Sequence, residues 1–357
     1  MPPDRRSFLA SSLGLPLLAT TAVGRPAAAG DAEPAAGPGL IRAENALPGA
    51  TDWQLTRVRL DDRNGFRASD IEGYCSRQSV AAGETIDIFV STRVAGEFRL
   101  EIFRTGYYGG RGARLMKTIG PLPAVPQPVP ESTRGDRHLH ECHWKPAVSL
   151  VIPEDWMSGV YLGRLTTADT TGHGYWQSYV VFVVKDDRPA DVCLQCSDNT
   201  WQAYNCWPND FSVYTHPRGN QGPWADVSFD RPYAKYAQIY EHPLSIGSGE
   251  WLCFEFPLAY WLEEQGYDVT YCSNVDMTDP RYARPGRFKA FLSNGHDEYW
   301  DLCQYEHAVR LRDTGTSLLF FSGNSVCWVT PLSAATDGRP NRIMFRGGPY
   351  GGEYRYA

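Results

Sequence analysis

The chain has 357 residues, a length that favours about two domains. Its net charge is −7 and no long basic run occurs, which argues against nucleic acid or an anionic membrane as a partner. Nine cysteines are an odd number, so they cannot all pair within one chain.

Residues 1–29 have the pattern of a signal peptide. Arg5 and Arg6 precede a short apolar run, and small residues follow it as a cleavage site would require. The Arg-Arg-x-Phe-Leu pattern resembles a twin-arginine signal, so we expect export to the periplasm or the medium. Asp4 stands where such signals usually have Ser or Thr, which leaves ordinary secretion open. An uncleaved membrane anchor is the other alternative, but the run is short for a spanning helix.

Residues 30–50 are rich in Ala, Pro and Gly and are expected to form a linker. Residues 51–186 are predicted to form a β-sandwich, because many short strands are separated by turn residues and no helical periodicity is present. Within 97–104, Phe98, Leu100 and Ile102 alternate with polar residues, which is typical of a half-buried strand. The strands expected here are 84–92, 97–104, 148–152, 159–166 and 176–184.

Residues 187–357 are predicted to form an α/β domain with a mostly parallel sheet, because strands alternate with helices. Gly266 is the expected end of the first of these helices. An irregular insert, 206–250, interrupts the alternation. The expected strands are 190–197, 267–273, 288–293 and 317–322, and the expected helices are 254–265 and 299–313.

Polar residues stand at the carboxyl ends of four successive predicted strands, where open α/β sheets bind ligands. They are 199–205, Asn274 with Asp276, 296–298, and Asn324. We therefore expect one wall of a crevice. The alternative for Asp297 and Glu298 is that they occupy the first turn of a helix, where acids suit the helix dipole.

Two other motifs suggest metals, but each has a simpler interpretation. Cys193-x-x-Cys196 lacks a second cysteine pair, and cysteines within a strand usually act as small apolar residues. His138-x-His140-x-Cys142-His143 would suit copper or zinc on a strand, but an edge strand beside a Pro-rich loop is favoured. The chain lacks a Gly-x-Ser-x-Gly elbow, a phosphate loop and a Rossmann fingerprint, which disfavours a serine hydrolase, a kinase or a dehydrogenase.

Four motifs together resemble the large (β) subunit of N,N-dimethylformamidase and its relatives. The resemblance extends over nearly everything after the linker, and the sandwich segment shares it in Gly73-Tyr-Cys-Ser76 and in residues 101–110. The four motifs are Thr200-Trp-Gln-Ala-Tyr-Asn205, Val227-Ser-Phe-Asp-Arg-Pro-Tyr233, Gly295-His-Asp-Glu-Tyr-Trp300 and Ser322-Gly-Asn324.

The resemblance implies a β-sandwich followed by an amidotransferase-like (flavodoxin-like) three-layer α/β domain. It also implies a mononuclear Fe(III) held by two tyrosinates and one glutamate. Glu298 corresponds to the glutamate and Tyr204 to one tyrosine, whereas Tyr233 is chosen for the second with Tyr214 as its competitor. His296 and Asn324 correspond to catalytic residues of the family.

Position 297 is Asp where relatives often have Pro, and we expect it to act only as a capping acid. The family's α/β domain continues beyond the length seen here, so the domain is expected to be incomplete at its C-terminus. A small helper subunit or a homo-oligomer is a further expectation.

The function expected from these features is that of an exported amidohydrolase of a small amide C–N bond. His296 is expected to carry a proton and Asn324 to orient substrate or water. One alternative is a non-catalytic cell-surface or periplasmic protein that binds carbohydrate or protein through its many aromatic residues. Another is a zinc-dependent hydrolase that uses the same crevice.

Overall fold

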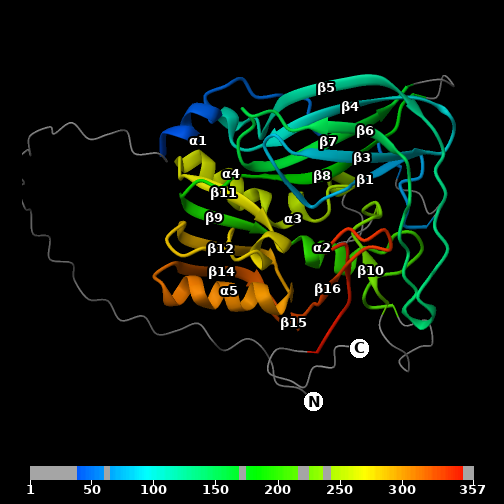
Figure 1. Ribbon diagram of the computed structural model, residues 1–357. Helices are drawn as coiled ribbons and strands as arrows, with labels where there is room; N and C mark the ends of the chain where they lie inside the picture. The colour runs from blue at the N-terminus through cyan, green and yellow to red at the C-terminus, as the bar shows by residue number, and fades with distance from the viewer. Residues whose placement is uncertain (1–37, 60–64, 169–173, 216–224, 236–242, 349–357) are drawn as a thin grey trace, which may run out of the picture. The chain divides into compact units, whose positions relative to one another are not determined.

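The computed structural model describes residues 38–59, 65–168, 174–215, 225–235 and 243–348 (Figure 1). The predicted signal peptide lies outside these residues. The described part is a mixed, β-rich fold with several sheets and a few helices. None of its helices has the length and apolar character needed to cross a membrane.

The first half of the chain forms two sheets whose strands are mostly antiparallel. One has the order β1-β3-β6 and the other β2-β8-β7-β4-β5, in which only β2 pairs in parallel. The strands are β1 (Ile71–Cys75), β2 (Ser79–Ala81), β3 (Thr85–Thr92), β4 (Gly96–Thr105), β5 (Ala113–Ala124), β6 (Pro146–Val151), β7 (Gly159–Thr167) and β8 (Gln177–Lys185). Short 3-10 turns occur at Tyr108–Gly110 and Gly135–Arg137.

Strand side chains point alternately to the two faces of a sheet, and apolar residues pack against both faces of the five-stranded sheet. Val180 and Phe182 of β8 join a cluster with residues of β1, β3 and β6, whereas Tyr179 and Val183 belong to a second cluster. Phe98, Leu100 and Ile102 of β4 are buried together in the first cluster, as their alternation predicted.

The second half contains a four-stranded parallel sheet of order β11-β9-β12-β14. Its strands lie between α4 and α5 in Figure 1. The elements are β9 (Ala190–Cys196), α2 (Asp198–Tyr204), α3 (Trp251–Phe254), α4 (Phe256–Gln265), β11 (Val269–Ser273), β12 (Phe288–His296), α5 (Leu302–Asp313) and β14 (Ser317–Gly323).

Short elements complete this half. Two small sheets have the orders β10-β17-β16 and β13-β15. Their strands are β10 (Val227–Ser228), β13 (Tyr299–Trp300), β15 (Trp328–Val329), β16 (Leu332–Ser333) and β17 (Ile343–Met344), and 3-10 turns occur at Pro243–Ser245 and Val275–Thr278.

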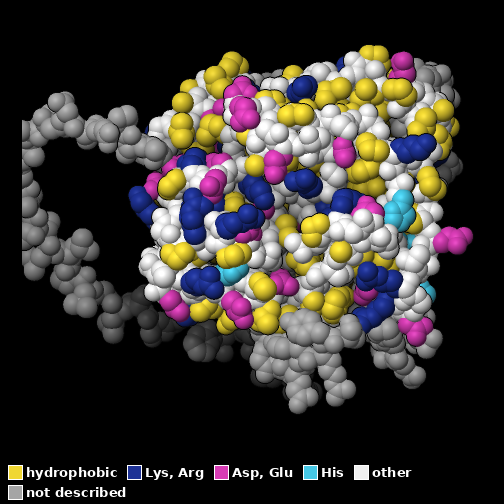
Figure 2. Space-filling model, viewed as in Figure 1, with side chains coloured by type: hydrophobic (Ala, Val, Ile, Leu, Met, Phe, Trp, Pro, Cys, Tyr) yellow, Lys and Arg dark blue, Asp and Glu magenta, His cyan; other side chains and the backbone are white. Residues whose placement is uncertain are grey.

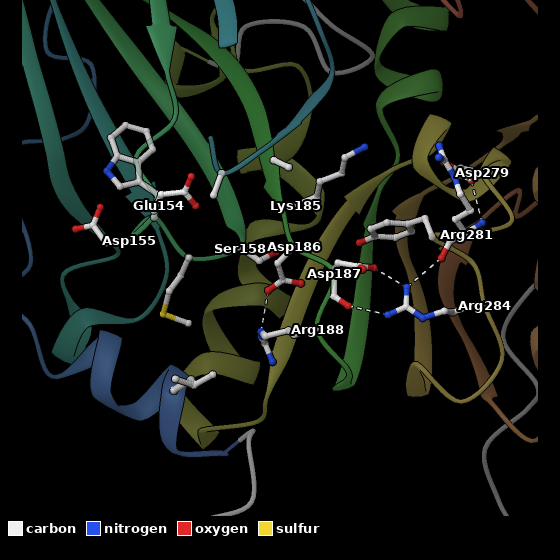
Figure 3. Close-up of a pocket in the computed structure, with 16 residues that line it drawn as sticks. Glu154, Asp155, Ser158, Lys185, Asp186, Asp187, Arg188, Asp279, Arg281 and Arg284 are labelled. Atoms are coloured by element: carbon white, nitrogen blue, oxygen red, sulfur yellow. Dashed lines mark hydrogen bonds and ion pairs between the residues drawn. The ribbon is translucent and has the colours of Figure 1, made fainter. Parts of the chain in front are cut away.

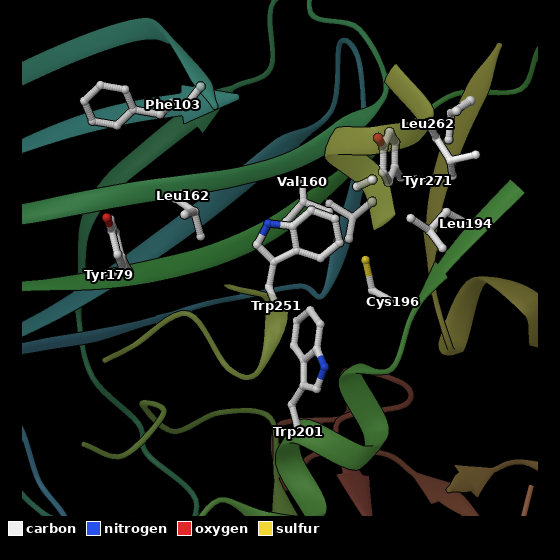
Figure 4. Packing of buried hydrophobic residues seen from close by; sticks show 14 of the residues in the cluster. Phe103, Val160, Leu162, Tyr179, Leu194, Cys196, Trp201, Trp251, Leu262 and Tyr271 are labelled. Carbon is white, nitrogen blue, oxygen red and sulfur yellow. The ribbon is translucent and has the colours of Figure 1, made fainter. Parts of the chain in front are cut away.

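One hydrophobic cluster joins the two halves of the chain. Figure 4 shows Phe103, Val160 and Leu162 of the five-stranded sheet on one side of Trp251, and Leu194 of the parallel sheet on the other. Parallel sheets that are covered on both faces typically consist of apolar strands.

A buried ion pair also joins the halves. The Arg104 guanidinium on β4 donates hydrogen bonds of 2.8 and 3.2 Å to the Glu263 carboxylate on α4, and both side chains are completely buried.

Local sequence signals explain several helix ends. Gly266 has a φ of 75° and ends α4 in the left-handed conformation, as predicted. Asp301 caps α5 and forms a capping box with Gln304. Helix α1 (Pro38–Asn45) differs from the predicted linker, because Ile41 is fully buried and the Asn45 side chain accepts hydrogen bonds from two backbone N–H groups.

Candidate functional site

The carboxyl ends of the parallel strands are joined by a buried polar network. The Asp297 carboxylate follows β12 and accepts hydrogen bonds from Gln195 (2.6 Å), Ser293 (2.8 Å) and Asn274 (3.1 Å). The Asp297 backbone N–H donates to the Ser322 hydroxyl on β14. The expected gathering of polar residues from the four strand ends therefore occurs.

The helix-dipole explanation for Asp297 and Glu298 is wrong. Helix α5 begins at Leu302 and is capped by Asp301, so the two acids lie before the helix rather than in its first turn. Asp297 is fully buried with three side-chain donors, which also makes the expectation of a capping acid wrong. Carboxylates buried in this way hold neighbouring segments in place.

Gly295 controls how the chain leaves β12. Its φ is 78°, and a Cβ atom at this position would lie 2.5 Å from the Cβ of Phe254. Only glycine combines a positive φ with such a close neighbour. His296 is the last residue of β12 and pairs with Gly323 of β14, and Glu298 follows two residues later, where its backbone N–H donates to the Thr200 hydroxyl on α2.

Tyr204, Tyr214 and Glu298 bring three oxygen-bearing side chains together. The Tyr204 hydroxyl donates to Glu298 Oε2 at 2.8 Å, and the Tyr214 hydroxyl donates to the Tyr204 oxygen at 2.7 Å. Tyr214 also lies 3.3 and 3.4 Å from the two oxygens of Glu298. Tyr204 ends α2, and the turn that carries Tyr214 is held beside it by the backbone bond from Val213 to Ala203.

Burial and shared hydrogen bonds together set the electrostatics of this group. Burial, together with the hydrogen bonds to Tyr214 and Glu298, raises the pKa of Tyr204. Burial also raises the pKa of Tyr214. Burial alone would raise the pKa of Glu298, but hydrogen bonds from His296 and Tyr204 hold it below its ordinary value. The cluster therefore combines an ionised carboxylate with phenols that keep their protons unless a cation replaces them.

His296 and Asn324 lie on the same side of this cluster. His296 Nε2 is 3.2 Å from Glu298 Oε2 and 3.4 Å from the Asn324 side-chain nitrogen. A bare Nε2 accepts from the amide, whereas a protonated Nε2 donates to the carboxylate. Asn324 has a φ of 49°, a left-handed conformation that asparagine tolerates better than most residues. The structure thus brings His296, Asn324, Glu298 and Tyr204 together.

Tyr233 does not join them. It packs against the cluster that joins the two halves of the chain, and its ring lies edge-on to Trp201 at 6.3 Å between centroids. No hydrogen bond connects it to Glu298 in the described part of the chain. Tyr214, the competing choice, is the tyrosine that lies beside Tyr204 and Glu298.

Three residues of the site were missed from the sequence. The Tyr299 hydroxyl donates to Tyr214 at 2.6 Å, and Trp328 Nε1 donates to Glu298 Oε1 at 2.8 Å. The Arg346 guanidinium lies over the Trp328 ring at 3.6 Å. Tyr299 was visible within the Gly295–Trp300 motif, but Trp328 begins one two-residue strand and Arg346 follows another, and such short strands leave no periodic signal.

The other metal candidates do not converge in the structure. Cys193 and Cys196 lie in separate hydrophobic clusters, and Cys193 instead faces Cys272 at 3.5 Å between sulfurs. His138 and His140 both contact the Phe211 ring. Within the described ranges, no group of three or more His, Cys, Asp and Glu side chains is arranged to hold a metal.

A cavity of 670 Å³ is lined in part by the segment between β8 and β9 (Figure 3). It lies where β9 begins, at the opposite end of the parallel strands from Glu298. Its arginines are paired with carboxylates: Arg188 with Asp186, Arg281 with Asp279, and Arg284 with Asp187. Because these charges are already compensated, the cavity offers less reactive chemistry than the Glu298 cluster.

The sequence of this chain also matches a known family. A family model described as "N,N-dimethylformamidase beta subunit-like, C-terminal" covers residues 99–346. The chain belongs to this family. In this N,N-dimethylformamidase beta subunit-like protein, the matched region contains Tyr204, Tyr214, His296, Glu298 and Asn324, so the resemblance noted from the motifs is confirmed.

No curated protein matches this N,N-dimethylformamidase beta subunit-like chain. Among solved structures, a cellulose-active LPMO, CelS2, in complex with copper is 21% identical over 30% of this chain and 52% of that chain, with a TM-score of 0.19. A Paenibacillus sp. cycloisomaltooligosaccharide glucanotransferase with cycloisomaltoheptaose is 9% identical over 37% and 17%, with a TM-score of 0.19.

A family 123 glycoside hydrolase from Clostridium perfringens is 10% identical over 77% of this chain and 48% of that chain, with a TM-score of 0.15. These TM-scores are too low for any of the three structures to bear on the fold or function of this chain.

Proposed function

We propose that this protein is a formamidase-like amidohydrolase that cleaves the C–N bond of a small amide and uses a mononuclear Fe(III). Tyr204, Tyr214 and Glu298 would hold the ion. One observation carries the proposal: two phenol oxygens lie 2.7 Å from each other and 2.8 to 3.4 Å from the oxygens of one carboxylate, beside His296. Family membership adds independent support.

The donor set suits a ferric ion. Phenolate and carboxylate oxygens are hard ligands, which favour a hard trivalent cation over softer metals. The Tyr204 hydroxyl donates to Glu298 and the Tyr214 hydroxyl to the Tyr204 oxygen, so a cation among these oxygens would take the place of the phenol hydrogens. Trp328 and His296 contact the two carboxylate oxygens of Glu298 from outside, and such contacts orient a ligand.

When bound, the ferric ion supplies Lewis acidity for an amide carbonyl oxygen or a water molecule. His296 takes a proton from the attacking water and delivers it to the amine, because an amine leaves readily only when it is protonated. Histidine suits this role because it exchanges protons near neutral pH. The Asn324 amide, 3.4 Å from the ring, fixes the orientation of the imidazole and can hydrogen-bond substrate or water.

The architecture that we propose is a β-sandwich followed by an amidotransferase-like (flavodoxin-like) α/β domain. The shared cluster between β1-β3-β6 and the five-stranded sheet supports the sandwich. The order β11-β9-β12-β14 places the second strand outside the first and the later strands on its other side, as in flavodoxin-like sheets. In such sheets the site lies at the carboxyl ends of the strands, where Glu298 stands.

Export is part of the proposal, and it rests on the Arg5-Arg6 pattern and the apolar run that follows it. A helper subunit or a homo-oligomer is also proposed, because the family description refers to a beta subunit. On the face in Figure 2, basic side chains gather across the middle of the molecule, and acidic side chains lie beside them.

Elemental analysis with a visible spectrum tests the proposal. The purified full chain is expected to contain one iron, to show a tyrosinate-to-iron absorption band, and to release ammonia from formamide or dimethylamine from N,N-dimethylformamide. Glu298→Gln should lose iron and activity together, whereas Glu264→Gln, at an exposed position on α4, should keep both. Folded protein that takes up no iron would overturn the proposal and favour a non-catalytic binding protein.

A further inference from the structure

Tyr299 is the third tyrosine of the site and is completely buried. Its hydroxyl donates to the Tyr214 oxygen at 2.6 Å, the shortest of the links between these phenols. Its ring stands edge-on to both Tyr204 and Tyr214, with centroids 6.4 Å apart in each case. It therefore contacts the cluster through the Tyr214 oxygen, whereas Tyr204 donates directly to the carboxylate.

The backbone of Tyr299 is fixed by α2. Its carbonyl accepts a hydrogen bond of 3.0 Å from the Asn199 side chain, and its N–H donates to the Thr200 hydroxyl at 3.4 Å. The same hydroxyl accepts from the Glu298 N–H at 2.9 Å. Tyr299 also pairs with Trp328 between β13 and β15. One helix thus sets the positions of Tyr204, Glu298 and Tyr299 relative to one another.

The hydrogen bonds run in one direction. Tyr299 donates to Tyr214, Tyr214 to Tyr204 and Glu298, and Tyr204 to Glu298. If Tyr204 and Tyr214 give their oxygens to a cation, the Tyr299 hydroxyl still donates to the Tyr214 oxygen. A donor outside the ligand shell fixes the angle of its ligand and reduces the ligand's electron donation to the metal.

We propose that Tyr299 is a positioning residue: its hydroxyl holds the Tyr214 oxygen at the metal and tunes that oxygen as a ligand. This inference rests on the proposed function, because it assigns the second tyrosine of the same site. It separates three neighbouring phenols into two ligands and one supporting donor.

Ferric binding by the Tyr299→Phe variant of the full chain tests the inference. Loss of the donor should weaken ferric affinity about 10- to 100-fold, as removal of outer contacts to metal ligands commonly does. It should also move the tyrosinate-to-iron band to lower energy, because the hydrogen bond no longer stabilises the filled phenolate orbital. Tyr161→Phe is the matched control, since Tyr161 is equally buried and has a hydroxyl bonded to the Met157 carbonyl at 2.8 Å.

A second variant covers the case in which Tyr299→Phe does not fold. Fluorotyrosine at position 299 is a stronger donor of the same shape, so it should move the band to higher energy. An unchanged band and affinity in Tyr299→Phe, or an unchanged band in the fluorotyrosine protein, would overturn the inference alone. Wild-type protein that binds no iron would overturn the proposed function and this inference with it.

Discussion

The Tyr214 hydroxyl lies 2.7 Å from the Tyr204 oxygen, although Tyr204 ends a helix and Tyr214 lies in a turn of the irregular insert. Both phenols reach Glu298 beyond the carboxyl end of β12. This relationship favours Tyr214 over Tyr233 as the second tyrosine of the proposed metal centre, a choice that the motifs alone left open.

The two tyrosines can be told apart by matched substitutions. Tyr214→Phe should reduce bound iron and the tyrosinate band to a small fraction of wild type, because one of three ligand oxygens is removed. Tyr233→Phe should keep both, since its ring packs against the core around Trp201. Iron content and the visible spectrum of the two purified variants show which tyrosine is the ligand. Loss of iron from Tyr233→Phe alone would restore the choice made from the motifs.

The position of Tyr214 could not be predicted because long-range contacts set it. The insert has no helical or strand periodicity, and one buried arginine organises it. The Arg231 guanidinium donates to the backbone carbonyls of Gln202, Asn205, Trp207 and Phe211, at distances of 2.6 to 3.2 Å. Burial among these carbonyls lowers the pKa of Arg231 to about 10.

Arg231→Lys should therefore unfold the insert more readily than its conservative chemistry suggests. A lysine has a single ammonium group and cannot reach four carbonyls held around a planar fork. Carbonyls left without donors cost about 1–3 kcal/mol each, so we expect at least about 3 kcal/mol in the free energy of unfolding. Denaturant unfolding measures this loss, and Arg281→Lys, at an exposed position, should change little. Equal stability of the two variants would contradict the role given to Arg231.

Asp297 should matter for stability although it is not a proposed ligand. Asp297→Ala leaves the donors of Gln195, Asn274 and Ser293 unsatisfied in a buried place. We expect a loss of about 3 kcal/mol or more, with weaker iron binding because the Glu298 segment is less fixed. Asp297→Asn keeps the shape and should lose less in both measurements. Iron affinity that does not change in Asp297→Ala would show that the network does not position Glu298.

Asp198 gives the protein a pH-dependent stability. Burial raises the pKa of Asp198 from 3.8 to about 8. Between these values the folded state holds a proton that the unfolded chain has released, so the free energy of unfolding falls as pH rises. This contribution is fully present below about pH 4 and is lost by about pH 8, with a slope of about 1.4 kcal/mol per pH unit at most.

Comparison of Asp198→Asn with wild type isolates this effect. The variant should lose part of the downward slope between pH 4 and 8 in denaturant unfolding. Asp155→Asn is the control, because Asp155 is exposed. If Asp198→Asn kept the full slope of the wild type, the proton would belong to another buried carboxyl group.

Most of the elements could be predicted from the sequence, because they follow local rules. Alternation located β3 and β4, and Gly266 located the end of α4. The start of α5 was placed three residues too early, since a two-residue strand, Tyr299–Trp300, intervenes before the Asp301 cap. Such a short strand forms only because β15 returns to pair with it, which no local pattern indicates.

The residues of the site that lie near strand ends could be predicted from the sequence. Glu298, His296, Asn324 and Tyr204 stand at or just after them, and they meet as expected. Trp328 and Arg346 reach the site from the last hundred residues through short pairings and turns. Their positions depend on the folded backbone as a whole, so composition and spacing could not reveal them.

The five-stranded sheet has no face that is free of partners, since one side meets β1, β3 and β6 and the other meets the parallel sheet. The Arg104–Glu263 ion pair adds to the contact between the five-stranded sheet and the second half of the chain. A gene cut between residues 186 and 187 would give two products, each with an apolar surface turned to water and with one member of the Arg104–Glu263 pair separated from the other. The two parts must therefore be expressed, exchanged and engineered as one piece, even though only the second carries the proposed metal ligands.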